Sequence, residues 1–299
     1  MSQINEQILP PRINLPSLEK NVLELRALKD FFLTGLVWGL AILASIPLVS
    51  VIYMLIMEGG ARLDFEAITA LPPAGFETGG GFGNAIVGTL TMVGIASALS
   101  IPIGTMAALY LAILNPNSKT ATVSRFLAKV LTGFPSILAG VFVYAVIVIT
   151  TGTYSAWVGG VALAVLMLPT VTLAAEEAMK QVPQRMKDAA FGMGCTRTQV
   201  IFKVVLPTAL PGIMTGVILA VAGAAGESAP LLFTALFSNY YMSELAEPTA
   251  SLSILIYNFS GMPFENQIEL AWTASLALVL LVLFFNIVAR VVGRTKFKE

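Results

Sequence analysis

Glu227 and Ser228 are the residues whose types and position most directly suggest chemistry in this chain of 299 residues. They interrupt a long apolar stretch, and we predict that both lie within a membrane-spanning helix over residues 212–236. A charge at the centre of such a span costs about 2.5–3.5 kcal/mol on insertion scales, so it is normally paired, protonated or hydrated. Glu227 is therefore a candidate functional carboxylate inside the membrane. The alternative is a structural hydrogen bond to a neighbouring helix.

Most other kinds of site are excluded by composition. The chain has no histidine and one cysteine, Cys195, so we expect no intrachain disulfide and no metal site of histidine or cysteine ligands. A phosphate-binding P-loop ends in Gly-Lys, and no such pair occurs; the glycine-rich run at 79–83 lacks lysine and is interpreted as a turn before a span. We expect no catalytic residue and no bound cofactor. A membrane-embedded enzyme is disfavoured because no second titratable group accompanies Glu227.

The second candidate site is the polar, basic stretch at residues 176–211, which separates two apolar segments. We expect Glu176 and Glu177, at its start, either to face a partner or to begin a solvated helix end. An Ala-Ala pair within the stretch, flanked by lysine and arginine, is expected to be exposed and to suit docking into a groove of a partner. A plain connecting loop is the alternative.

Helix boundary signals in this stretch predict two helices joined by a sharp turn. The signals are Pro183 in the first turn of one helix, Gly192 and Gly194 as its left-handed stop, Thr196 with Gln199 as a capping box for the next, and Pro207 and Pro211 as interruptions before the following span. The predicted element is therefore a helix, a turn and a second helix.

The composition indicates that membrane-spanning helices hold the candidate residues in place. Hydrophobic residues make up 57% of the chain and charged residues 11%, and the mean hydropathy is +0.84. A soluble domain is roughly 25% charged. A spanning helix needs about 20 apolar residues, and the alternating segments of a membrane β-barrel are missing. We predict an all-α, polytopic membrane protein with six transmembrane helices, at residues 31–57, 84–114, 130–150, 154–175, 212–236 and 270–289.

The basic residues predict the orientation of the chain. Of its 17 Lys and Arg residues, all except Arg62 fall in the N-terminal segment, the loops after the second and fourth spans, or the C-terminal tail. Because Lys and Arg are enriched in cytoplasmic loops, we expect both termini in the cytoplasm. Residues 1–30 are expected to be a cytoplasmic segment, not a signal peptide, with an interfacial or a solvated helix at 17–30. The net charge of the chain is zero, and nothing in the charge pattern indicates a nucleic-acid partner.

Small residues recur at every fourth position in the fifth predicted span. They are Gly212, Gly216, Ala220 and Ala224. Such a stripe lets two helices approach closely in a membrane, so we predict tight packing here. Gly216, Ala220 and Gly223 also precede Glu227 on its own side of the helix, and we expect a cavity beside the carboxylate.

The basic stretch resembles a known motif. Asp188-Ala189-Ala190, then Gly194 after three residues, then Val204-Val205-Leu206-Pro207 after nine, is similar to the EAA motif of permeases from ABC importers, with Asp188 in place of Glu and Val204 in place of Ile. The resemblance implies the helical bundle of a type I ABC-importer permease. It also implies a set of residues that couple the chain to ATPase subunits: Asp188, Ala189, Ala190, Gly194, Leu206 and Pro207.

From the second span onward, the chain resembles the PstA-type permeases of phosphate ABC importers. The resemblance lies in residues 83–104, 133–148, 168–183, 206–220, 226–235 and 253–272. The string "GESAPLLFTA" at 226–235 separates this group from other permeases. The resemblance implies a permease domain at residues 31–299 that moves phosphate across a bacterial inner membrane, with Glu227 and Ser228 on the translocation path.

The resemblance also implies partners. They are a homologous second permease subunit (PstC-type), two ATPase subunits (PstB-type) that bind ATP and Mg²⁺ and dock on residues 176–211, an external phosphate-binding protein (PstS-type), and membrane lipid.

One position departs from the family pattern. An arginine is expected one helical turn before Glu227, and Gly223 stands there. We therefore expect Glu227 to pair with a basic residue of the second permease or to be neutral, and a permease for another oxyanion, such as molybdate or tungstate, stays open. A second alternative is an autonomous ion-coupled carrier that uses Glu227, but it would need discontinuous helices in both halves of the sequence, and these are not found.

Overall fold

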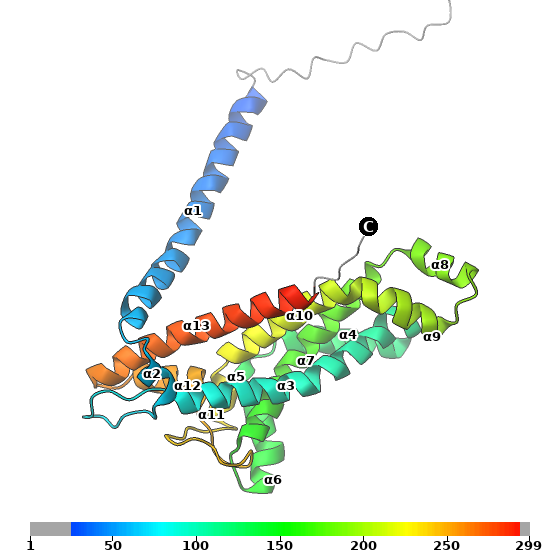
Figure 1. Ribbon diagram of the computed structural model, residues 1–299. Coiled ribbons are helices and arrows are strands. Elements are labelled where there is room, and N and C mark those ends of the chain that lie inside the picture. The colour runs from blue at the N-terminus through cyan, green and yellow to red at the C-terminus, as the bar shows by residue number, and fades with distance from the viewer. Residues whose placement is uncertain (1–24, 294–299) are drawn as a thin grey trace, which may run out of the picture. The chain divides into compact units, whose positions relative to one another are not determined.

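The computed structural model describes residues 25–293, in which every regular element is a helix (Figure 1). The chain divides into two units, Met1–Tyr53 and Met54–Glu299, and each is described by itself. Helix α1 (Leu25–Gly60) begins in the first unit and contains Pro47. The predicted helix at 17–30 lies largely outside the described residues.

The second unit holds all the other helices. In chain order they are α2 (Phe65–Thr69), α3 (Gly83–Leu109), η1 (Tyr110–Leu114), α4 (Lys119–Thr132), α5 (Ser136–Val143), η2 (Tyr144–Val148), α6 (Ile149–Thr151), α7 (Ala156–Lys180), α8 (Gln184–Gly192), α9 (Arg197–Val200), η3 (Ile201–Val205), α10 (Leu206–Gly226), α11 (Ala229–Leu232), α12 (Leu252–Ser260) and α13 (Glu265–Gly293). The three η elements are turns of π-helix, which are wider than those of an α-helix.

Among the described residues, 5 helices are long and apolar enough to cross a membrane, and the number rises to 6 if one bent pair counts as a single span. The five are Leu28–Gly60, Gly83–Leu114, Ala156–Lys180, Arg197–Gly226 and Glu265–Val288. The prediction of an all-α, polytopic membrane protein is confirmed. The orientation of its termini stays a prediction.

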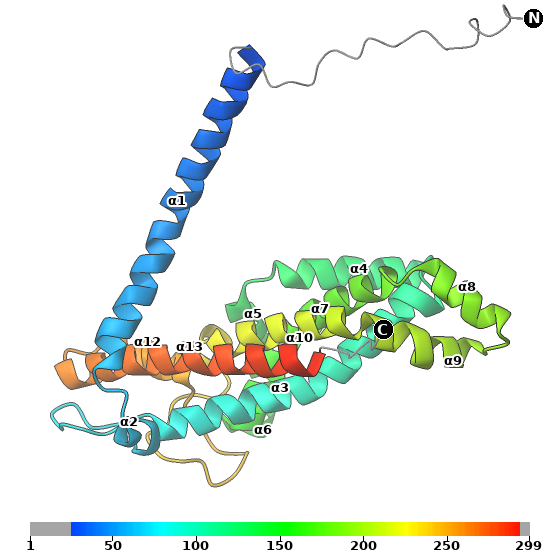
Figure 2. The same ribbon diagram turned by 45° about the horizontal axis from the view of Figure 1, so that its top comes forward.

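Helix α7 is the centre of the second unit, because it packs along both α3 and α10, while α10 also packs against α13 (Figures 1 and 2). Glycines allow the close approach of α3 to α7. A Cβ atom at Gly160 of α7 would lie 2.7 Å from the Cβ of Ile95, and one at Gly104 of α3 would lie 2.9 Å from Val171. Small residues at such contacts let membrane helices gain van der Waals packing along their length.

The third predicted span, 130–150, is not one straight helix. The sixth candidate span is the bent pair Lys119–Thr132 and Ser136–Thr151, whose axes differ by 106°. The break lies at Gly133–Pro135, where Pro135 adopts a non-helical conformation (φ −57°, ψ 125°) before α5 begins. Proline disfavours a helical conformation in the residue before it but suits a helix start, so the chain ends one helix here and begins another.

The fifth predicted span, 212–236, is wrong at both ends. The observed helix runs over Arg197–Gly226, and Glu227 then turns into an extended conformation (φ −74°, ψ 122°). The short helix α11 follows, with Pro230 in its first turn. Pro230 has no N–H to bond the carbonyl of Gly226, and its ring would clash with that carbonyl in a continuous helix. The span therefore ends at Gly226.

Pro207 and Pro211 do not interrupt the helix, contrary to the prediction. α9, η3 and α10 are continuous, and within η3 the N–H of Leu206 bonds the carbonyl of Ile201, five residues back. A widened turn of this kind moves the carbonyl with which a following proline ring would collide. Pro207 is thereby accommodated at the start of α10.

Candidate functional site

The segment from α8 to α9 has the predicted helix, turn, helix form, and local hydrogen bonds explain it. Gly194 has φ +84°, its N–H bonds the carbonyl of Phe191, and the N–H of Cys195 bonds the carbonyl of Ala190. These two bonds close a Schellman motif, which satisfies carbonyls at the end of a helix. Gly194 is the left-handed stop, whereas Gly192 is still the last residue of α8.

The predicted capping box at the start of α9 is confirmed. The side chain of Thr196 accepts from the backbone N–H of Gln199 at 3.4 Å, and the side chain of Gln199 accepts from the backbone N–H of Thr196 at 2.8 Å. The two bonds fix the direction in which the chain leaves the turn. α8 is therefore held at a defined angle to the long helix that follows.

The two alanines of the motif have different environments, which corrects the expectation that both are exposed. Ala189 is exposed, but Ala190 is 2% exposed and belongs to the buried core that also contains Val200. The exposed side of α8 carries Met186 and Ala189, and Met193, which directly follows the helix, is 78% exposed. Methionines around a small residue form an adaptable apolar surface of the kind used in binding.

The remaining residues of the motif lie in different environments. Asp188 is exposed and accepts a hydrogen bond of 2.8 Å from the side chain of Gln184, one turn earlier on α8. Leu206 is half-buried against the core, and Pro207 is exposed at the start of α10. The motif thus combines an exposed end (α8) with a buried attachment to the bundle.

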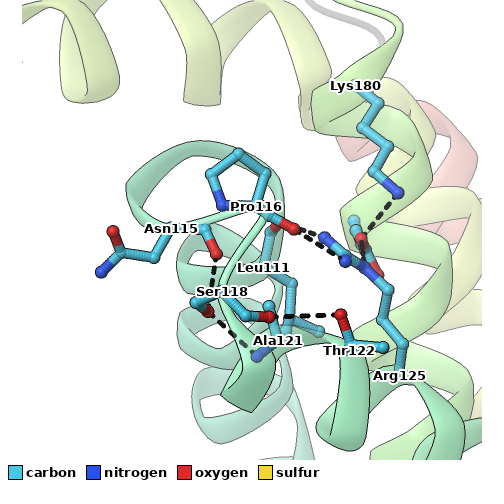
Figure 3. Close-up of polar contacts among 9 residues, drawn as sticks. Leu111, Asn115, Pro116, Ser118, Ala121, Thr122, Arg125 and Lys180 are labelled. Atoms are coloured by element: carbon cyan, nitrogen blue, oxygen red, sulfur yellow. Dashed lines mark hydrogen bonds and ion pairs between the residues drawn. The ribbon is translucent and has the colours of Figure 1, made fainter.

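An ion-pair cluster joins Arg125 of α4 and Lys180 of α7, both labelled in Figure 3, to the buried Glu176 of α7, and it corrects the expectation for Glu176. The carboxylate of Glu176 is neither solvated nor turned toward a partner, because its side chain is 4% exposed. Its Oε1 atom bonds Nε of Arg125 at 2.5 Å and Nζ of Lys180 at 2.7 Å. A buried carboxylate is tolerated only when it is paired in this way.

Two arginines also bond the end of the helix formed by α3 and η1. Arg125 donates to the carbonyls of Leu111 and Pro116, at 2.6 and 2.9 Å, as Figure 3 shows. Arg197, the first residue of α9, donates to the carbonyls of residues 113 and 114, at 2.9 and 2.7 Å. This double contact was not predicted from the sequence. The spacing of Glu176 and Lys180 by four residues was a readable sign of an ion pair, but the contribution of Arg125 was not.

Glu227 lies at the end of α10 and not in the middle of a span, which corrects its predicted position. It is half-buried, its N–H bonds the carbonyl of Ala224 at 3.3 Å, and its own carbonyl accepts from the hydroxyl of Ser253 on α12 at 2.9 Å. Within residues 25–293 its carboxylate has no hydrogen bond or ion pair. Ser228 is also half-buried, and its carbonyl accepts from backbone N–H groups of α11.

The small residues of α10 lie on its α7 side. A Cβ atom at Gly212 would lie 2.7 Å from the Cβ of Ala178, and one at Gly216 would lie 2.2 Å from the Cβ of Ala174; Ala220 and Ala224 are buried. A cavity was expected beside Glu227, next to Gly216, Ala220 and Gly223; at Gly216 the space is filled by Ala174 of α7. The open side of α10 is at Gly223 and Gly226, where an added Cβ would meet nothing within 4 Å.

No group of three or more His, Cys, Asp or Glu residues that could hold a metal ion is found within the part of the chain that the structure describes. The candidate functional features are therefore separate: the surface at α8, the ion-pair cluster of Arg125, Glu176 and Lys180, and the break at Glu227 at the other end of α10.

Comparisons with known proteins agree with one another. Residues 100–298 match the family described as "Binding-protein-dependent transport system inner membrane component". The chain is 35% identical over 278 residues to the "Phosphate transport system permease protein PstA" of Yersinia pestis, with 93% of this chain and 91% of the relative covered. It is 37% identical over 279 residues to the protein of that name from Pasteurella multocida, with 93% and 95% covered. It is 38% identical over 265 residues to the "Probable phosphate transport system permease protein PstA" of Methanocaldococcus jannaschii, with 88% and 92% covered.

Two solved structures share the fold at low sequence identity. A chain of a bacterial alginate ABC transporter in complex with an alginate pentasaccharide-bound periplasmic protein has a TM-score of 0.62 at 16% identity, covering 92% of this chain and 99% of that chain. A chain of the MetNI methionine ABC transporter in an inward-facing conformation has a TM-score of 0.58 at 20% identity, covering 71% and 94%. At these identities the likeness concerns the fold alone.

Proposed function

Because the chain belongs to the family of binding-protein-dependent transport system inner membrane components and has the fold of an ABC-transporter permease, we propose that it is the permease subunit of an ATP-driven phosphate importer. The choice of phosphate is supported by relatives that are 35% to 38% identical over most of the chain and are named as phosphate transport permeases. The chain is a multi-pass membrane protein, and we place it in a bacterial inner membrane with both termini in the cytoplasm.

The observation that carries this proposal is the geometry of α8. A short helix with an exposed apolar surface at Met186, Ala189 and Met193 is held rigidly by the Gly194 turn and the capping box of Thr196. Such a surface, attached to a long helix that crosses the membrane, suits a groove on a partner that moves. We assign this groove to an ATPase subunit, which binds ATP and Mg²⁺, because the chain itself has no Gly-Lys P-loop.

The complete transporter needs further chains. A homologous second permease completes the path, and an external phosphate-binding protein delivers the substrate. Two ATPase subunits dock on residues 176–211 of this chain and on the corresponding segment of the second permease. ATP-driven closure of the ATPase subunits displaces α8 and shifts the bundle between inward-facing and outward-facing states. Net import requires that ATP and the loaded binding protein bind these two states with different affinities.

The open side of α10 at Gly223 and Gly226 is where the second permease or the substrate path meets Glu227 in this proposal. A lone carboxylate repels phosphate. We therefore assign to Glu227 a basic partner on the second permease, or a neutral form.

Replacing Glu227 with glutamine is expected to lower ATP-driven phosphate uptake by about tenfold or more, because the amide keeps the shape of the side chain but cannot form the ion pair that we assign to Glu227 and a basic residue of the second permease. The measurement is uptake of radiolabelled phosphate by vesicles that contain the complete complex. Glu265→Gln, which changes an exposed glutamate at the start of α13, is the control and should leave uptake unchanged. Full transport by Glu227→Gln would remove this carboxylate from the mechanism.

The proposed function itself is tested by phosphate uptake into proteoliposomes that hold the complete complex and the binding protein, with and without ATP on the ATPase side. ATP-dependent uptake that arsenate inhibits and molybdate or sulfate does not is the expected result. Preferential uptake of molybdate or tungstate would assign another oxyanion and make Gly223 a mark of changed specificity. Phosphate uptake without ATP would replace the importer by an ion-coupled carrier.

A further inference from the structure

Arg125 and Arg197 belong to different segments, α4 and α9, yet both bond the carboxyl end of the helix formed by α3 and η1. Between them they bond four backbone carbonyls within residues 111–116, at 2.6 to 2.9 Å. The last carbonyls of any helix have no partner within the helix, and the end carries a partial negative charge. Two guanidinium groups therefore supply both the hydrogen bonds and the positive charge that this end lacks.

The end in question is a turn of π-helix and not of α-helix. η1 is a π-helical turn, in which the N–H of Asn115 bonds the carbonyl of Tyr110, five residues back. π-Helical turns are less stable than α-helical ones and recur at functional sites. The segment opposite, η3, is a second π-helical turn that directly follows α9. A π-helical turn thus lies on each side of the Arg197 contact.

The two arginines differ in how they are held. The side chain of Arg125 is 22% exposed and is bonded to the buried carboxylate of Glu176 on α7, which Lys180 also bonds. Arg197 is exposed and follows the cap residue Thr196, so its position depends on the turn that carries α8. Arg125 is therefore the fixed contact of α3 with the core helix α7, and Arg197 is its contact with the segment that bears the docking surface.

We propose that Arg197, Arg125 and Glu176 are positioning residues that convert displacement of the α8–α9 segment into displacement of the cytoplasmic ends of α3 and α7. Because Arg197 is hydrogen-bonded to the last carbonyls of η1, displacement of α9 also displaces the end of η1. The ion pair between Arg125 and Glu176 transmits this displacement to α7. α7 in turn packs against Gly212 and Gly216 of α10, so α3, α7 and α10 move together. This inference rests on the proposed function.

The experiment measures, in the same proteoliposomes, phosphate taken up and ATP hydrolysed by the complete complex. Arg197→Ala is expected to lower the number of phosphate ions moved per ATP by about tenfold, while the ATPase subunits stay bound and basal hydrolysis stays within about twofold. Arg197→Lys keeps the charge and should restore part of this ratio, although one ammonium group lacks the fixed donor geometry of a guanidinium. Glu176→Gln should lower the ratio as Arg197→Ala does.

Lys129→Ala is the matched control, because Lys129 is an exposed basic residue on the same helix as Arg125 and its side chain makes no ion pair within residues 25–293. It should leave the ratio at the wild-type value. A ratio that is unchanged in Arg197→Ala and Glu176→Gln, or uptake and hydrolysis that fall together in proportion, would overturn the proposal, since either result denotes at most a structural role.

Two further readouts keep the outcomes separate. If the complex with Glu176→Gln fails to assemble, the ratio of phosphate to ATP measured for Arg197→Ala decides the test. Arg197 is exposed, so its loss leaves no buried charge unpaired. If the wild-type complex itself shows no ATP-dependent phosphate uptake, the proposed function fails and this inference fails with it. If the wild-type complex takes up phosphate normally and the variants move the same number of phosphate ions per ATP as the wild type, only the positioning role is rejected.

Discussion

Replacing Ala189 with tryptophan is expected to lower ATP-driven phosphate uptake at least about 100-fold while the chain still folds and inserts. Ala189 is exposed between Met186 and Met193, so the indole ring displaces no atom of this chain. On the proposed partner it would have to enter a groove shaped for a methyl group, and residues at the centre of an interface carry most of its binding energy. The measurement is recovery of the ATPase subunit with the affinity-purified chain, together with vesicle uptake.

Two variants serve as controls for this prediction. Ala74→Trp places the same ring at an exposed position in the loop between α2 and α3, at the opposite end of the second unit (Figure 1), and should leave recovery of the ATPase subunit unchanged. Ala190→Trp alters a residue that is 2% exposed and should instead reduce the amount of folded chain. Normal ATPase recovery with Ala189→Trp would show that the exposed side of α8 is not the docking surface.

Replacing Gly216 with leucine is expected to destabilise the chain by about 3 kcal/mol or more, at or above the upper end of the range for overpacked cores. A Cβ atom at this position would already lie 2.2 Å from the Cβ of Ala174, and the remaining atoms of leucine have no room between α10 and α7. Because α7 also packs along α3, separation of α10 from α7 disturbs the centre of the bundle. The measurement is thermal denaturation of the purified full-length chain in detergent.

Two positions on the same helix provide a graded control. Gly223 lies about two turns further along α10, and an added Cβ there meets nothing within 4 Å, so Gly223→Leu should leave the midpoint of denaturation nearly unchanged. A Cβ at Gly212 would lie 2.7 Å from that of Ala178, so Gly212→Leu should be intermediate. Equal stability of the Gly216 and Gly223 variants would contradict the close packing of α10 on α7.

Helix α10 has two sides that differ in packing. The α7 side is dense and built from small residues, whereas the side with Gly223 and Gly226 is open. In the proposed transporter the dense side keeps the bundle rigid, and the open side is available to the second permease and to the substrate path. Gly223, where the resemblance led us to expect an arginine, therefore lies on a surface that faces outward from this chain and not in its core.

The membrane class, the helical content and two helix boundaries, the stop at Gly194 and the start at Thr196, were determined by the sequence alone. Long apolar windows can satisfy their backbone groups in a membrane only as helices or closed barrels, and the lack of alternation left helices. The Gly194 stop and the Thr196–Gln199 capping box were also readable, because their hydrogen bonds join residues within one or two turns of each other. The EAA motif and the wider resemblance also indicated the permease family, and the match to the family model and to curated relatives confirms it.

Only the tertiary structure decided which residues act together. Arg125 and Glu176 are 51 residues apart, and Arg197 reaches carbonyls more than 80 residues back, so no local pattern marks these contacts. Ala189 and Ala190 are the same residue type in adjacent positions, and packing alone buries one and exposes the other. Hydropathy and helix signals act over one or two turns, whereas burial and ion pairing depend on which distant segments the fold brings together.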